Sequence, residues 1–181
     1  MSRPPHARER VLDAFEALLI DEGERAATLE ATARAAEVSK GGLLYHFASK
    51  EALEEGLIAR LQGLVDADIH EMATAPDGPV SYFLRTSVMN DSPLDRAIIA
   101  VARLAQGGSP PAAAALRSTR ALWAESLRPH TVDQTALDLV MLVSDGLYYN
   151  NSLEGAGVAG PVPTGQAMAD LIARVVAAAG V

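Results

Sequence analysis

Apolar residues recur along this chain with the spacing of a helix face, three and four positions apart. Val11, Phe15 and Leu18 mark one such face in the stretch 7–21, and a longer face runs through 50–72. No stretch of useful length alternates apolar and polar residues as a half-buried strand does. The pattern therefore predicts an all-α protein.

Residues typical of helix ends divide the chain into about nine helices. Gly23 is typical of a helix that ends in the left-handed conformation, and Thr28, Ser39 and Ser49 are typical N-caps. Proline-containing clusters separate the later segments, and the stretch 155–163 is expected to be a flexible loop. The predicted helices are 7–21, 29–36, 40–46, 50–72, 79–90, 94–106, 111–127, 132–153 and 165–179.

The composition supports a helical fold and excludes several classes of chemistry. The chain has 34 alanines among 181 residues, but only 3 Phe, 4 Tyr and 1 Trp, and alanine is the best helix former. It has no cysteine, which excludes disulfides, thiolate metal sites and a cysteine nucleophile. No apolar run approaches the roughly 20 residues that span a bilayer, and residues 1–10 contain no signal peptide. A cytoplasmic protein without a membrane segment is expected.

Charge is distributed unevenly along the chain. Residues 1–50 hold 7 Lys+Arg and 8 Asp+Glu, a net charge of −1, whereas 51–181 hold 8 and 15, a net charge of −7; together they give the total of −8. So acidic a chain is not a non-specific nucleic-acid coat. Its two lysines, Lys40 and Lys50, nevertheless lie in one short segment. The cationic chemistry of the lysines is therefore concentrated there.

The segment that contains both lysines has the pattern of a helix-turn-helix. Two short predicted helices are joined by a tight turn at 37–39 and follow a longer helix. Gly41 and Gly42 open the second helix, although glycine disfavours a helix by roughly 1 kcal/mol relative to alanine. Close approach to a phosphate or a base edge is one reason to find glycine there. The hydrogen-bond donors around this helix are Ser39, Lys40, Tyr45, His46 and Lys50.

The same segment carries an extended motif. The chain reads Thr28-x4-Ala33-x2-Ala36-x-Val38-Ser39-Lys40-Gly41-Gly42-Leu43-Leu44-Tyr45-His46-Phe47-x-Ser49-Lys50-Glu51-x-Leu53. This pattern resembles the DNA-binding signature of TetR-family transcriptional regulators, and the resemblance covers about residues 8–60. It implies a homodimeric, ligand-responsive regulator, usually a repressor, that binds a palindromic operator. The implied domains are a DNA-binding domain at 1–50 and a ligand-binding and dimerisation domain at 51–181.

The resemblance also assigns roles to individual residues. Leu44 stands where many relatives carry a hydrogen-bonding aromatic residue, so it is expected to contact only a thymine methyl group. Selectivity would then depend on Lys40 and on DNA shape. An N-terminal arm with Arg3, Arg8 and Arg10 either reaches DNA or is a disordered tail. The implied DNA-binding residues are Thr28, Ser39, Lys40, Gly41, Gly42, Leu44, Tyr45, His46 and Lys50.

Two residues depart from the family pattern. Glu37 occupies a turn position that usually holds glycine, and a left-handed conformation there would carry strain of order 1 kcal/mol. Its charge would also weaken binding to phosphate. Thr32 stands where an aliphatic residue normally fills the core. Both departures motivate an alternative, a helical ligand- or protein-binding module that has lost useful DNA affinity.

The C-terminal segments contain the larger side chains that would line a ligand cavity. Each one alone is better explained as core, but together they favour a pocket for a small, mostly apolar ligand. Asp145 would pair with a cationic ligand or with an arginine such as Arg96 or Arg103, and a structural ion pair is favoured. The candidate ligand-binding residues are His70, Phe83, Met89, Trp123, Met141, Asp145, Tyr148 and Tyr149.

Small residues in the last two predicted helices, 132–153 and 165–179, favour their close packing in a dimer. Asp66 and His70 share one helix face, but no second ligand pair is evident, so a solvated face is favoured over a metal site. No phosphate-binding loop, dinucleotide fingerprint or metalloprotease motif is present. The sequence therefore predicts no metal, no cofactor and no enzymatic activity.

Overall fold

The computed structural model describes residues 6–88, 90–154 and 162–180, and the chain divides into two compact units. Unit 1 comprises Met1–Val65 and Asp91–Thr119, and unit 2 comprises Asp66–Asn90 and Arg120–Val181. Within the described ranges the secondary structure is entirely helical. The prediction of an all-α fold of about nine helices is confirmed.

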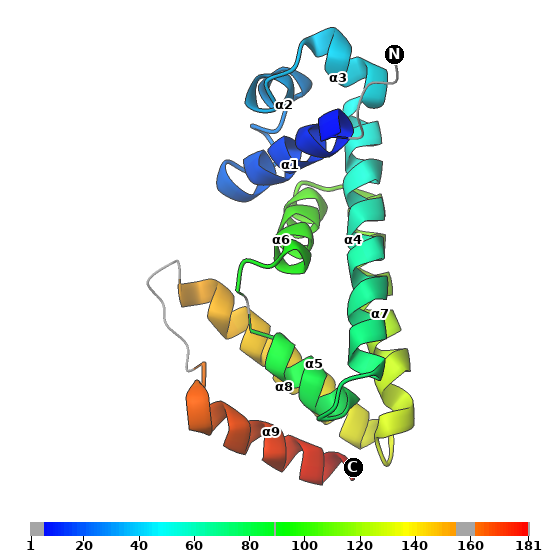
Figure 1. Cartoon of the computed structure of the whole chain (residues 1–181), viewed down its shortest axis with the longest axis vertical. Coiled ribbons are helices and arrows are strands. Elements are labelled where there is room, and N and C mark those ends of the chain that lie inside the picture. The colour runs from blue at the N-terminus through cyan, green and yellow to red at the C-terminus, as the bar shows by residue number, and fades with distance from the viewer. Residues whose placement is uncertain (1–5, 89, 155–161, 181) are drawn as a thin grey trace. The chain divides into compact units, whose positions relative to one another are not determined.

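Unit 1 is built around α1 (His6–Asp21). This helix packs against α2 (Leu29–Ala35) and α3 (Lys40–His46) on one side and against α6 (Pro93–Gln106) on the other (Figure 1). The first parts of α4 (Lys50–Ala73) and α7 (Pro110–Leu127) complete the unit. Its fully buried core includes Phe15, Leu19, Leu43, Leu53 and Leu57.

Hydroxyl side chains begin three of these helices, as their spacing predicts. The Thr28 hydroxyl accepts a hydrogen bond from the Ala31 backbone N–H at 3.2 Å. The Ser39 hydroxyl accepts one from the Gly42 N–H at 3.0 Å, and Ser49 precedes α4 in the same way. Each cap satisfies a backbone donor that the first helical turn leaves without a partner. The boundaries of α2, α3 and α4 therefore follow from local chemistry.

Unit 2 packs α5 (Pro79–Thr86), α8 (Gln134–Glu154) and α9 (Gly165–Ala179) against one another. The ends of α4 and α7 and a short 3-10 helix, Arg128–His130, also belong to it. Its core includes Met72, Leu84, Leu127, Leu137 and Val140, all nearly or fully buried.

The main difference from the predicted helices is the end of α5. The stretch 79–90 was expected to be one helix, but α5 ends at Thr86. The buried Ser87 hydroxyl donates to the Phe83 carbonyl at 2.6 Å and lies 2.7 Å from the Ser144 hydroxyl of α8. This polar contact lies directly after the last residue of the helix. The predicted functional division at residue 50 stays a prediction, and most of the predicted loop, 155–161, lies outside the described residues.

Candidate nucleic-acid interface

The turn between α2 and α3 is tight and holds Glu37 in the left-handed region, with φ of +53°. The Val38 N–H donates to the Ala33 carbonyl at 2.9 Å, which closes the turn. Arg10 of α1 donates to the Ala36 carbonyl at 2.7 Å from outside. Glu37 therefore adopts the left-handed conformation whose strain was considered for this position. An L-residue in this conformation carries strain of about 1 kcal/mol.

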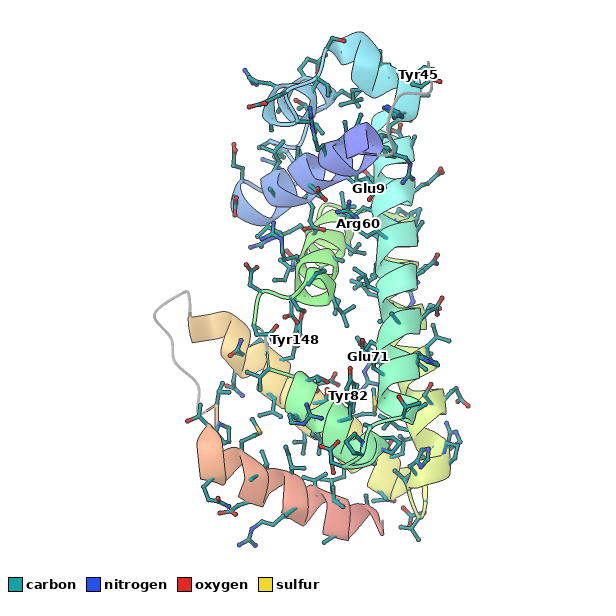
Figure 2. The ribbon with its side chains drawn as sticks, viewed as in Figure 1. Glu9, Tyr45, Arg60, Glu71, Tyr82 and Tyr148 are labelled. Carbon is teal, nitrogen blue, oxygen red and sulfur yellow. The ribbon has the colours of Figure 1, made fainter. Side chains whose placement is uncertain are left out.

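Helix α3 presents one face to the core and another to solvent. Leu43 is fully buried and Phe47, which follows the helix, is 3% exposed. On the outer face, Leu44 is 37% exposed and Tyr45 is 79% exposed; Tyr45 is labelled on α3 in Figure 2. A Cβ added at Gly41 would meet no atom of the described residues within 4 Å, so packing against them does not require glycine there. On the outer face of α3, a binding partner could therefore approach the backbone at Gly41 closely.

The predicted DNA-binding residues of α3 and its ends lie together on unit 1. Tyr45 and His46 make an edge-to-face contact, with ring centroids 5.1 Å apart. Ser39 caps the helix, and Thr28 is exposed at the start of α2. Gly42 is tighter than Gly41, because a Cβ there would lie 3.2 Å from the Ser39 hydroxyl.

Both lysines are held by glutamates, which the sequence analysis did not foresee. Lys40 Nζ lies 2.5 Å from the Glu30 carboxylate, and this pair is exposed. Lys50 contacts the Glu24 carboxylate and also donates to the Glu24 carbonyl at 3.2 Å. The hydrogen bond from Lys40 lowers the pKa of the Glu30 carboxyl below its ordinary value. The one sequence feature that could have indicated the Glu30–Lys40 pair is that its residues are only 10 positions apart.

Thr32 is fully buried, and its hydroxyl has no hydrogen-bond partner among the residues that the structure describes. The departure from an aliphatic residue at this position therefore places a polar atom in the core of the helix-turn-helix. A buried hydroxyl without a partner costs roughly 1–3 kcal/mol. This site and Glu37 are two local sources of instability in the segment that would meet DNA.

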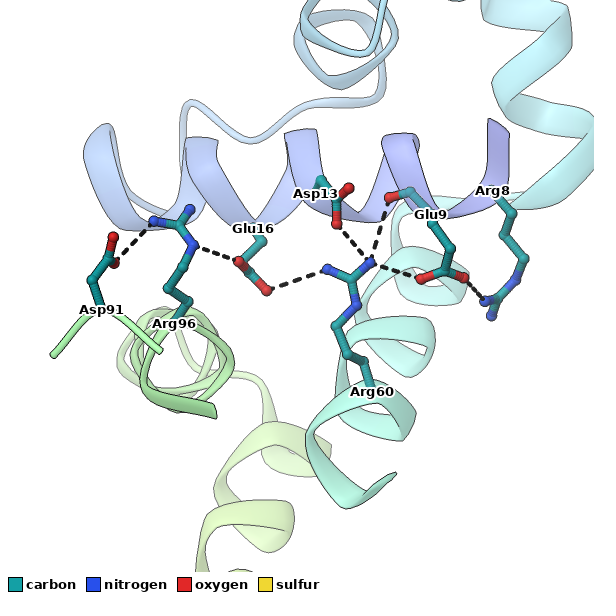
Figure 3. Close-up of polar contacts among 7 residues, drawn as sticks. All are labelled: Arg8, Glu9, Asp13, Glu16, Arg60, Asp91 and Arg96. Atoms are coloured by element: carbon teal, nitrogen blue, oxygen red, sulfur yellow. Dashed lines mark hydrogen bonds and ion pairs between the residues drawn. The ribbon is translucent and has the colours of Figure 1, made fainter. Parts of the chain in front are cut away.

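An ion-pair network joins α1 to α4 and α6 within unit 1 (Figure 3). Arg60 of α4 lies 2.8 Å from both Glu9 and Asp13, and 3.3 Å from Glu16. Arg96 of α6 lies 2.9 Å from Glu16, whose side chain is only 8% exposed. The Arg60 hydrogen bond lowers the pKa of the Glu9 carboxyl. These partners are 44 to 80 residues apart along the chain, so no sequence pattern indicated them.

The candidate ligand residues of the C-terminal segments are only partly brought together. Phe83, Trp123 and Met141 belong to or pack on the core of unit 2, and the Phe83 and Trp123 ring centroids are 5.8 Å apart. His70 and Tyr149 are exposed, and Tyr148 is half-buried. Met89 lies outside the described residues.

Asp145 forms an ion pair, but its partner is Arg120 at 2.7 Å. The suggestion of Arg96 or Arg103 as the partner was wrong. Arg96 is held by Glu16 and Asp91, and Arg103 donates to Gln106. Arg120 of α7 can reach Asp145 because both belong to unit 2.

Sequence reasoning also missed a polar cluster around Asp68. The Trp123 indole N–H donates to one Asp68 oxygen at 2.9 Å, and the Tyr82 hydroxyl lies 3.1 Å from the other. The same hydroxyl lies 3.0 Å from Glu71, and Tyr82 and Glu71 are labelled in Figure 2. Burial, followed by the charge of Asp68, raises the pKa of Tyr82. Among the described residues, no group of three or more His, Asp or Glu side chains could hold a metal ion.

A groove of about 350 Å³ lies between α4 and α7 in unit 1, and none of the candidate ligand residues is among the described residues that line it. The groove is lined by Glu55, Ile58, Ala59, Gln62, Pro111, Ala114, Ala115 and Ser118.

In the part of the chain that is described, no helix is both long and apolar enough to cross a membrane.

Comparisons with known proteins bear on both the motif and the fold. Residues 11–56 match the family model described as bacterial regulatory proteins, tetR family. The fold is similar to Salmonella enterica GusR, with 19% identity, a TM-score of 0.71, and coverage of 100% of this chain and 99% of that one. It is also similar to a transcriptional regulator from Rhodococcus sp. Rha1, with 19% identity, a TM-score of 0.65 and 95% coverage of each chain.

A third similar structure is the multidrug binding protein EbrR complexed with imidazole. It shares 22% identity and a TM-score of 0.57, with coverage of 95% of this chain and 96% of that one. No curated protein sequence matches the chain.

Proposed function

Because residues 11–56 identify this chain as a member of the tetR family of bacterial regulatory proteins, we propose that it is a cytoplasmic transcriptional regulator that binds a palindromic DNA operator as a homodimer. The family consists of transcription factors, and the chain is accordingly a regulator and not an enzyme. The observation that carries the proposal is the outer face of α3, which combines Tyr45, Lys40 and an unobstructed Gly41. Repression is the proposed mode of regulation.

In the proposed complex α3 enters the major groove. The backbone at Gly41 approaches the DNA closely because no side chain intervenes, and Leu44 contacts a thymine methyl group. Lys40 contacts phosphate or a base edge. Thr28, Ser39, Gly42, Tyr45, His46 and Lys50 complete the proposed DNA-binding surface, and phosphate contacts position the helix.

Dimerisation is proposed through α8 and α9. On α8, Leu139 and Leu142 are exposed three residues apart, with Leu142 65% exposed. On α9, Ala169, Ala173 and Ala177 are exposed at intervals of four residues. Apolar and small side chains on adjacent helices suit close packing against a second copy. A dimer would also supply the two recognition helices that two half-sites require.

The proposed effector is a small, mostly apolar molecule bound in the C-terminal domain, residues 51–181. Phe83, Trp123 and Met141 support this proposal because they form an aromatic and thioether cluster. A ligand that prefers the conformation with lower operator affinity releases the DNA, and a coupling of about 1–3 kcal/mol changes affinity about 5–150-fold. The remaining proposed ligand residues are His70, Met89, Asp145, Tyr148 and Tyr149.

The proposal is tested by selecting bound duplexes from a genomic pool at two salt concentrations. Recovery of a palindromic motif at both concentrations is expected. Lys40→Ala should then weaken binding to the recovered motif, whereas Arg117→Ala, which removes an exposed positive charge from α7, should not. Equal binding by the parent and Lys40→Ala would overturn the assignment of α3 to the groove.

A second candidate function is a ligand- or protein-binding module without useful DNA affinity. The left-handed Glu37 and the pairing of both lysines with glutamates favour it. Recovery of no duplex from folded, dimeric protein that binds a small molecule would support this candidate.

A further inference from the structure

The two lysines of the helix-turn-helix differ in how firmly they are held. The Lys50 and Glu24 side chains are 28% and 30% exposed, and Lys50 also donates to the Glu24 carbonyl. The Lys40 and Glu30 side chains are 57% and 63% exposed, and they meet in an ion pair of 2.5 Å. Lys40 is therefore the lysine that can change partners at low cost.

The surroundings of Glu24 strengthen this difference. Gly107, at the end of α6, leaves room for the Glu24 side chain, because a Cβ at Gly107 would lie 2.7 Å from Glu24 Cγ. The methylene stem of Glu24 is thus packed, and the ammonium of Lys50 is tied to an ordered partner. Glu30, in contrast, lies in the first turn of α2 with its carboxylate in solvent. An exposed ion pair of this kind contributes little to stability.

We propose that Glu30 is an affinity-determining residue that competes with DNA for Lys40. In the free protein the Lys40 ammonium rests on Glu30, and in the DNA complex it moves to a phosphate or base acceptor. This inference depends on the proposed DNA-binding function. The inference assigns a role in DNA affinity to Glu30, a residue that need not contact DNA. Glu30 acts by binding Lys40 in the free protein and releasing it in the complex.

Electrostatics gives the expected direction of the effect. A lysine neutralised by an adjacent carboxylate attracts DNA less strongly than a free lysine, and the carboxylate itself repels phosphate. Each phosphate neutralised by a lysine contributes about −0.9 to the slope of log K against log salt. Glu30→Gln should therefore increase operator affinity about two- to fivefold at low salt and steepen the slope by up to about one.

The experiment is a double-mutant cycle on operator affinity, measured by fluorescence anisotropy over a series of salt concentrations. The variants are Glu30→Gln, Lys40→Met and the double variant. Competition for Lys40 predicts that Glu30→Gln loses most of its effect in the Lys40→Met background. Asp66→Asn, which makes the same change in net charge at an exposed site on α4, should leave affinity unchanged.

The outcomes separate the inference from the function on which it depends. If Glu30→Gln has the same effect with and without Lys40, a general charge effect replaces the inference. If the parent binds the operator and Glu30→Gln binds equally well, the inference is also overturned. If Glu30→Gln binds a duplex but neither the parent nor the double variant does, the inference is supported. If neither protein binds any duplex, the proposed function fails and the inference fails with it.

Discussion

Glu37 is a residue whose backbone conformation conflicts with its side chain. Its φ of +53° lies in the left-handed region, where glycine is tolerated without a steric penalty. Glu37→Gly should therefore raise the free energy of unfolding by about 0.5–1 kcal/mol, after allowance for the greater entropy of glycine in the unfolded chain. Urea denaturation measures the change. Ala35→Gly, at the exposed end of α2, is the matched control and should destabilise; a loss of stability in Glu37→Gly would contradict the argument.

Thr32 offers a second prediction at the same scale. Valine has nearly the shape of threonine but lacks the hydroxyl that is buried without a partner. Thr32→Val should raise the free energy of unfolding by about 1–2 kcal/mol, as measured by thermal or urea denaturation. Thr28→Val should do the opposite and cost about 1 kcal/mol, because the Thr28 hydroxyl caps α2. No gain from Thr32→Val would show that the hydroxyl is satisfied in solution.

Single residues were predictable where their role is local. Thr28, Ser39 and Ser49 cap the helices that their types and spacing indicate, and Glu37 has the conformation that its place in the turn implies. The Glu24–Lys50 pair was not predictable, because its two residues are 26 positions apart, one in the loop between α1 and α2 and the other at the start of α4. A local sequence pattern contains no information on such tertiary contacts.

At the scale of elements, Arg60 connects α4 to three acidic residues of α1. Arg60 lowers the pKa of Glu9 in the folded state, so this contact stabilises the protein above the ordinary carboxyl pKa of 4.5 and is lost as pH falls below it. The free energy of unfolding should therefore fall less on acidification in Arg60→Met than in the parent. The difference should be less than about 1 kcal/mol, because Glu9 is half exposed.

The measurement is urea denaturation at a series of pH values from about 6 to 3, across the range in which a carboxyl group with a lowered pKa titrates. Arg117→Met is the control, since Arg117 is exposed on α7 and should leave the pH profile unchanged. An Arg60→Met profile parallel to that of the parent would contradict a role for the Arg60–Glu9 contact in acid stability.

Most helices were predicted to within a few residues, and the exception is instructive. Ser87, directly after the end of α5, contacts Ser144, which is 57 residues away. A contact between residues so far apart leaves no mark in the local pattern. The burial of the candidate ligand residues could not be predicted either, because it also depends on tertiary packing. Large side chains such as Phe83 and Met141 fill the core, while Tyr149 is exposed, and only packing separates these outcomes.

At the scale of the whole molecule, the proposed assembly depends on the exposed face of α8. Leu142→Glu places a charge where a second copy would bury an apolar side chain, so the dissociation constant of the dimer should rise at least about tenfold. Sedimentation velocity over a range of concentrations measures it. Leu122→Glu, at an exposed leucine of α7, is the control. An unchanged dimer in Leu142→Glu would exclude this face from the interface.

Because the chain has only two lysines, the chemical reactivity of Lys40 can be measured selectively. Apart from the terminal amine, Lys40 and Lys50 are its only primary amines, and they differ twofold in side-chain exposure, 57% against 28%. An acylating reagent applied briefly should therefore modify Lys40 first, and mass spectrometry could follow that one position. If α3 binds DNA as proposed, the DNA would shield Lys40 and its release would restore the reactivity of that lysine, so occupancy of α3 could be measured without introducing a dye or a cysteine.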